Sequence, residues 1–196
     1  MKTFALAGQS RTDIGKKATK AVRNAGDIPA ILYGGEKEIA FSVSTSAVRN
    51  LVYTPNIYVV ELTIDGATCN AIVQDLQFHP VTDEVLHIDF LQIFEDKPVV
   101  IEVPVKLEGL AEGVKQGGKL SLEMRKLRVK ALYANVPERL TINVSELGLG
   151  KTVQVGQLSF ENLELLNAKN AVVCAVKLTR AARGAKAAAM AAANKK

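Results

Sequence analysis

The sequence predicts a mainly β protein with few helices: an N-terminal small β-barrel with helices, a C-terminal β-sandwich-like domain and a basic, Ala-rich tail. Most apolar residues fall in short runs that alternate or are rich in β-branched side chains, which is typical of strands. Only two segments keep a helical spacing. A polar break at residues 95–98 divides the chain. We therefore predict domains at residues 1–94 and 95–180, followed by a tail at residues 181–196.

The first domain is predicted to contain about six strands and two helices, which within about ninety residues favours a small barrel with helices at its ends. The first helix is expected over residues 16–25 and ends before Gly26, and the second is expected over residues 45–52 and ends before Pro55. Asp65-Gly66 is a strong signal for a hairpin turn. The expected strands are residues 3–9, 30–33, 38–43, 57–64, 69–76 and 85–93.

The second domain reads as nearly all strand, with a Gly-rich connection at residues 109–118. Short strands at this spacing with turns between them favour a β-sandwich. The expected strands are residues 99–107, 127–133, 140–144, 153–155, 163–165 and 172–178. The cations Arg125, Lys126, Arg128 and Lys130 fit the charged outer face of such a strand better than an RNA contact. The tail has no apolar stripe, so it is either a frayed helix or disordered until it meets RNA.

Composition narrows the classes of function. With 48% apolar and 23% charged residues the chain is globular, and no run of eighteen apolar residues predicts a membrane span. Cys69 and Cys174 lie far apart, have no metal-ligand spacing, and favour a reducing compartment, so we expect a cytoplasmic protein without cofactor or metal. The net charge of +5 is uneven: residues 1–94 hold 8 Lys and Arg against 10 Asp and Glu, whereas residues 181–196 hold four cations and no acid.

The positive charge of the first domain is concentrated at one end of the sequence. Residues 11–23 carry five cations and one acid, Asp13. On the predicted helix Lys16, Lys20 and Arg23 share one face. Together with Arg11 and with Tyr33 before a Gly-Gly pair, they suit a phosphate backbone with a base or ribose nearby, and the glycines leave room for that backbone. A solvated helix face beside a core tyrosine explains the same residues.

A second cluster of polar residues falls on the last two strands of the first domain. His87 and Asp89 alternate with Leu86, Ile88 and Phe90, so they share the face opposite the core. The pair is a fragment of a catalytic dyad or metal site, a plain surface pair, or a set of hydrogen-bonding groups for an RNA minor groove. Gln74 on the preceding strand can donate to and accept from a base edge.

Two motifs give the chain a resemblance. Arg11, Gly15-Lys16, Lys20, Arg23 and the run from Pro29 to Gly35 form the first, and the segments 74–80 and 86–90 (QDLQFHP and LHIDF) form the second. Both resemble the L twenty-five family of bacterial large-subunit ribosomal proteins, in its long form, the Ctc general stress proteins. The resemblance covers essentially the whole chain.

The resemblance implies a non-enzymatic protein of the large ribosomal subunit that binds 5S rRNA through its first domain. The matched positions implied to contact RNA are Arg11, Lys16, Lys20, Arg23, Tyr33, Gln74, His87 and Asp89. Neighbouring ribosomal proteins are possible partners of the second domain, and no membrane is involved. Two alternatives stay open: a stress-related protein-binding module, and a small hydrolase that uses His87 and Asp89.

Overall fold

The computed structural model describes residues 1–180, so the predicted basic tail lies outside the described residues. The described chain is mainly β with three α-helices, which confirms the predicted fold class. It forms two compact units: Met1–Val99 with Leu132–Glu138, and Val100–Ala131 with the chain from Arg139 onward. The sequence places Leu132–Glu138 in the second domain. The Tyr133 hydroxyl, however, donates a hydrogen bond of 3.3 Å to Glu95 Oε1 in the first unit.

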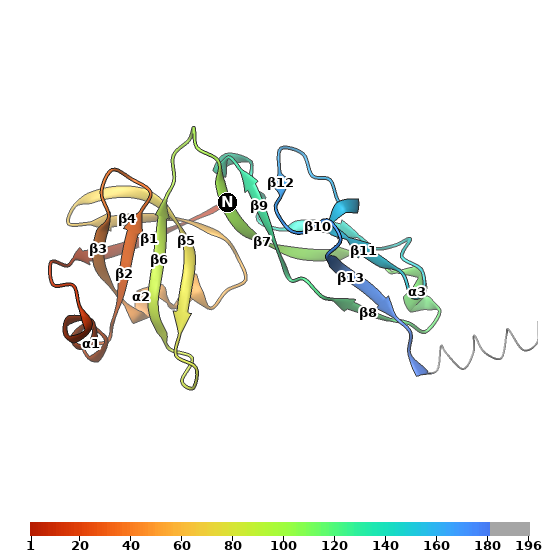
Figure 1. The fold of residues 1–196 in the computed structure, drawn as a ribbon, viewed down its shortest axis with the longest axis horizontal. Helices are drawn as coiled ribbons and strands as arrows, with labels where there is room; N and C mark the ends of the chain where they lie inside the picture. The colour runs from red at the N-terminus through yellow and green to blue at the C-terminus, as the bar shows by residue number, and fades with distance from the viewer. Residues whose placement is uncertain (181–196) are drawn as a thin grey trace, which may run out of the picture. The chain divides into compact units, whose positions relative to one another are not determined.

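Six strands of the N-terminal unit close into a barrel in the order β1-β3-β2-β6-β5-β4 (Figure 1). The pairs β1–β4 and β2–β6 are parallel, and the other pairs are antiparallel. The strands are β1 (Lys2–Ser10), β2 (Asp27–Tyr33), β3 (Ile39–Ser44), β4 (Tyr58–Ile64), β5 (Ala67–Phe78) and β6 (Val85–Gln92). Closure gives every strand two neighbours, so the barrel has no free sheet edge.

The barrel is filled by the apolar side chains that alternate inward along each strand. Phe41, Leu62, Ile88 and Phe90 are fully buried, and the rings of Phe41 and Phe90 lie 5.6 Å apart between centroids. Each such side chain contributes about 1.5 to 3 kcal/mol by leaving water. The outward residues of the same strands are consequently the ones available for a partner.

The helices of the N-terminal unit differ in how they attach to the barrel. α2 (Thr45–Val52) covers one end of the barrel and buries Val48 and Leu51, whereas α1 (Lys16–Asn24) buries no residue. The predicted Asp-Gly hairpin is confirmed: both turn residues have positive φ, 48° at Asp65 and 89° at Gly66, and they join β4 to β5.

The C-terminal unit contains two sheets, one of four strands in the order β10-β7-β9-β12 and one of three strands in the order β11-β13-β8. Its elements are β7 (Val99–Glu108), α3 (Glu112–Lys115), β8 (Lys119–Leu122), β9 (Lys126–Ala131), β10 (Leu140–Asn143), β11 (Thr152–Gln154), β12 (Glu164–Leu165) and β13 (Val172–Lys177), with a 3-10 turn at Val155–Gln157. The 3-10 turn at Tyr133–Asn135 belongs to the N-terminal unit. The strand expected over residues 127–133 ends at Ala131, because the chain turns at Tyr133–Asn135 before Pro137.

The alternation of β9 explains the basic cluster of the second domain. Leu127 and Val129 are buried, and the cations between them face outward. Arg128 Nε lies 3.0 Å from Glu102 Oε1, and Lys130 Nζ lies 3.8 Å from Glu164 Oε2. These ion pairs neutralise charge on the outer face of this sheet. Among residues 1–180, no helix is long and apolar enough to cross a membrane.

Candidate nucleic-acid interface

The lysines of α1 form no ion pair within the described part of the N-terminal unit. Lys16, Lys17 and Lys20 are exposed and form no ion pair with any residue in the described range 1–180. The first turn of the helix contains no acid. Cations there oppose the helix dipole, which costs a few tenths of a kcal/mol each. The helix therefore presents a positive end that no described side chain neutralises.

Arg23 has a different role from the lysines, because its guanidinium is hydrogen-bonded to the backbone of the same unit. Its Nε and Nη2 atoms donate hydrogen bonds of 3.0 and 2.8 Å to the carbonyl oxygen of Leu86 on β6. This carbonyl is available for two reasons. Leu86 is skipped in the β5–β6 register, and Pro29, just before the first β2–β6 pair, has no N–H to donate. Arg23 thus attaches α1 beside the start of β6.

The polar face predicted for β6 exists, with His87 and Asp89 side by side. The Nδ1 atom of His87 lies 2.8 Å from the Oδ1 atom of Asp89, and both side chains are half-buried. The buried Nδ1 atom nevertheless has no directed hydrogen bond within the described residues, so the carboxylate lies off the line of the ring N–H. The two side chains are therefore in close contact without an aligned hydrogen bond between them.

Tyr33 belongs to the same face, because it pairs with Leu91, two residues after Asp89 on β6, and β2 and β5 lie on either side of β6 (Figure 1). Partial burial, followed by the negative charges of Asp89 and Asp75, raises the pKa of the Tyr33 phenol above its usual value of 10.0. The hydroxyl therefore stays protonated at neutral pH and is a hydrogen-bond donor.

A bulge in β5 adds Asp75 and Gln77, two residues that the sequence analysis missed, to the face that carries Gln74. The register passes from Val73–Phe90 directly to Asp75–Asp89, so Gln74 and Asp75 together oppose Asp89. The next outward pair is Gln77–His87. Strict alternation from Ala71 and Val73 would turn Asp75 into the core. A carboxylate at an apparent core position was the one signal in the sequence that the strand is bulged.

Arg11 is placed apart from these side chains. Its backbone N–H donates to the Ala40 carbonyl oxygen on β3 at 2.8 Å, and its Nη2 atom donates to the Asp13 carbonyl oxygen at 3.4 Å. Its Nε and Nη1 atoms are buried without a hydrogen-bond partner in the described structure. The structure therefore brings together Tyr33, Gln74, His87 and Asp89, attaches α1 next to them, and leaves Arg11 at the β3 side.

The Gly-Gly pair after Tyr33 serves packing inside the protein. Gly34 has a φ of 92°, and a Cβ atom there would lie 2.6 Å from Leu91 Cδ1. A Cβ atom on Gly35 would collide with the amide of Gln92. The space beside both glycines is therefore occupied by β6, and the expectation that they leave room for an approaching backbone is wrong in those directions.

The chemistry of this face is that of hydrogen bonding. His87 and Asp89 have the composition of a catalytic pair, yet residues 1–180 contain no group of three or more His, Cys, Asp or Glu side chains that could hold a metal ion. Cys69 is half-buried, and burial raises the pKa of its thiol, which reduces the amount of nucleophilic thiolate.

Comparison with known proteins assigns both units. Residues 6–90 match the Ribosomal L25p family, and residues 98–180 match the C-terminal domain of ribosomal protein TL5. The chain is 64% identical over 194 residues to a protein of Bacteroides fragilis, covering 96% of this chain and 99% of the relative. It is 65% identical over 187 residues to a protein of Porphyromonas gingivalis (94% and 97% covered) and 66% identical over 192 residues to one of Parabacteroides distasonis (95% and 99% covered).

All three relatives are named large ribosomal subunit protein bL25, a structural component of the ribosome. The predicted family, the predicted non-enzymatic role and the predicted location on the cytoplasmic ribosome are thereby confirmed, and the hydrolase alternative is excluded. The chain belongs to the bL25 family of large-subunit ribosomal proteins.

Proposed function

We propose that this ribosomal protein binds 5S rRNA through its N-terminal unit. The lysines of α1 contact phosphates, and the outward side chains of β2, β5 and β6 contact base edges and 2′-hydroxyls in a minor groove. The observation that carries the proposal is the attachment of α1 to β6 by Arg23. Lys16 and Lys20 lie on the same helix as Arg23, so this attachment joins their helix to the strand that carries His87 and Asp89.

The α1 lysines and the strand face have different roles in this proposal because their charges differ. Asp75 and Asp89 would repel a phosphate, so the strand face is suited to neutral groups that donate hydrogen bonds. The only base donor in a minor groove is the amino group of guanine, and a carboxylate is its natural acceptor. Tyr33 and Gln74 supply donors for 2′-hydroxyls and base acceptors. The face therefore fits the wide minor groove of an RNA helix.

Arg11 and Arg23 enter this proposal with reduced roles. Arg23 mainly positions α1, because two of its N–H groups are already used. Arg11 has two buried guanidinium nitrogens at the β3 side, so less of its side chain is available to RNA than of the α1 lysines. A contact between the C-terminal unit and neighbouring ribosomal proteins, and a stress-related role, stay predictions.

The test is binding of the full-length protein to transcribed 5S rRNA as a function of salt. Changing Lys16 and Lys20 together to Ala should flatten the slope of log K against log salt by about 1.8, since each phosphate contact contributes about 0.9. The matched control changes Lys115 and Lys119 to Ala, two exposed lysines of the C-terminal unit. Equal slopes for the two double variants would reject the role given to α1.

A further inference from the structure

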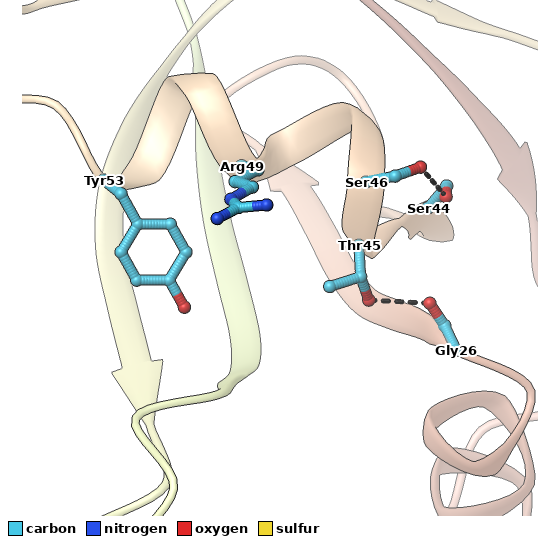
Figure 2. A pocket seen from close by; sticks show the side chains of 6 residues that line it. All are labelled: Gly26, Ser44, Thr45, Ser46, Arg49 and Tyr53. Carbon is cyan, nitrogen blue, oxygen red and sulfur yellow. Dashed lines mark hydrogen bonds between the residues drawn. The ribbon is translucent and has the colours of Figure 1, made fainter.

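A pocket beside α2 has no part in the interface described above. Figure 2 shows its lining, which comes from the link between α1 and β2, from the end of β3, and from α2 with the residue that follows it. The lining residues are Gly26, Ser44, Thr45, Ser46, Arg49 and Tyr53. None of them is acidic, so the pocket carries the single positive charge of Arg49.

The polar groups of the pocket are mainly donors. Arg49 is exposed and forms no ion pair within the described part of the chain. The Thr45 hydroxyl is already used, because it donates to the Gly26 carbonyl oxygen at 2.6 Å. The hydroxyls of Ser44 and Ser46 lie 2.9 Å apart, so one proton lies in their shared hydrogen bond and the other is free. A guanidinium with a free hydroxyl suits an anion.

The pocket is also lined by the aromatic ring of Tyr53, which two contacts hold in place. The Tyr53 hydroxyl donates to the Asp83 carbonyl oxygen at 2.9 Å, and its ring packs against Phe78 with centroids 6.4 Å apart. The residue is still 58% exposed. In Figure 2 the ring and the Arg49 guanidinium lie next to each other. A fixed, exposed ring beside a cation is a surface on which a nucleoside stacks above its phosphate.

We infer that this pocket binds one phosphate of the ribosomal RNA backbone through Arg49 and the serine hydroxyls, with the attached nucleoside against Tyr53. This inference rests on the proposed function and extends its footprint around the end of the barrel. Residues that line or hold the pocket lie close in sequence to Arg23 and Leu86, which attach α1 to the proposed interface. Gly26 follows Arg23 by three residues, and the Asp83 that holds Tyr53 precedes Leu86, the acceptor of Arg23, by three residues.

The experiment compares full-length wild-type protein with Arg49→Ala, Tyr53→Leu and Arg125→Ala on transcribed 5S rRNA, by salt-dependent binding and hydroxyl-radical footprinting. Arg125 is an exposed arginine of the C-terminal unit and is the matched control. Arg49→Ala should flatten the salt slope by about 0.7 to 0.9 and weaken binding about threefold to tenfold. Tyr53→Leu should weaken binding without changing the slope, because it removes stacking and no charge.

The footprints separate the pocket from the α1 interface. Arg49→Ala and Tyr53→Leu should expose the same few nucleotides, and these should differ from the nucleotides exposed by Lys16→Ala with Lys20→Ala. If Arg49→Ala matches Arg125→Ala in slope and footprint while the lysine variant loses contacts, the pocket is not an RNA site and the proposed function stands. If the wild-type protein leaves no footprint on 5S rRNA, the proposed function and the pocket's role both fall.

Discussion

At the residue scale, the interface contains two carboxylates that repel each other and that both act on one phenol. Asp75 and Asp89 are opposite each other on β5 and β6, and both raise the pKa of Tyr33. Like charges directly opposite in a sheet destabilise it, usually by a fraction of a kcal/mol. The sheet tolerates this pair at the place where a donor-rich partner such as a minor groove is expected. We infer that the residues are arranged for binding more than for stability.

The prediction at this scale concerns the phenol of Tyr33. Asp89→Asn should lower the pKa of Tyr33 toward 10.0 but not to it, because burial is the largest cause of the shift and Asp75 remains. The phenol's contribution to stability is fully present below about pH 10 and is lost as pH rises through the raised pKa of the folded state. In Asp89→Asn that loss should be smaller and should be complete at lower pH, because the pKa of the folded state lies closer to that of the unfolded state.

The measurement is an NMR titration of the tyrosine ring carbons between pH 8 and 12, with Asp65→Asn at the β4–β5 turn as the control. Asp65 is not among the causes of the Tyr33 shift, so its removal should leave the titration unchanged. An unchanged or higher pKa of Tyr33 in Asp89→Asn would show that the two groups do not interact.

At the scale of elements, the guanidinium of Arg23 supplies side-chain hydrogen bonds that attach α1 to the barrel. The helix buries no residue, and Arg23 joins it to β6. Arg23→Ala should therefore speed hydrogen exchange of the α1 amides and lower rRNA affinity, while the free energy of global unfolding changes by only about 1 kcal/mol. Ala has the higher helix propensity, so weaker protection cannot come from propensity.

Lys17→Ala is the control for this variant, since Lys17 lies on the same helix and makes no ion pair with a described residue. Its α1 amides should keep wild-type exchange rates. If Arg23→Ala also keeps those rates, contacts other than this guanidinium hold the helix. The position of the α1 lysines then does not depend on Arg23.

The elements also show what a sequence can and cannot predict here. Alternation placed the barrel strands and the outward pair His87 and Asp89, because one face of each strand must be buried. The bulge at Gln74 was missed, because register depends on the facing strand. The hydrogen bonds of Arg23 to the backbone were also missed, because they too depend on a strand that is distant in sequence. Their acceptor is a carbonyl, 63 residues away in the chain, that Pro29 leaves without a donor.

At the scale of the whole molecule, the placement of charge distinguishes the two units. The N-terminal unit has more acids than cations among residues 1–94, yet three of its lysines without an ion pair to a described residue are gathered on α1. The outer face of β9 in the C-terminal unit has its cations paired with Glu102 and Glu164. We therefore expect rRNA binding to depend mainly on the N-terminal unit, with little electrostatic contribution from β9.

The most direct test is an NMR map of full-length, isotope-labelled protein with and without transcribed 5S rRNA. We predict that the largest amide shifts fall on α1, on β2 near Tyr33, on β5 from Gln74 to Gln77 and on β6 from His87 to Asp89. The outward residues of β4 and β9 should shift little. Large shifts confined to β4 or to the C-terminal unit, with α1 and β6 unchanged, would contradict the proposed interface.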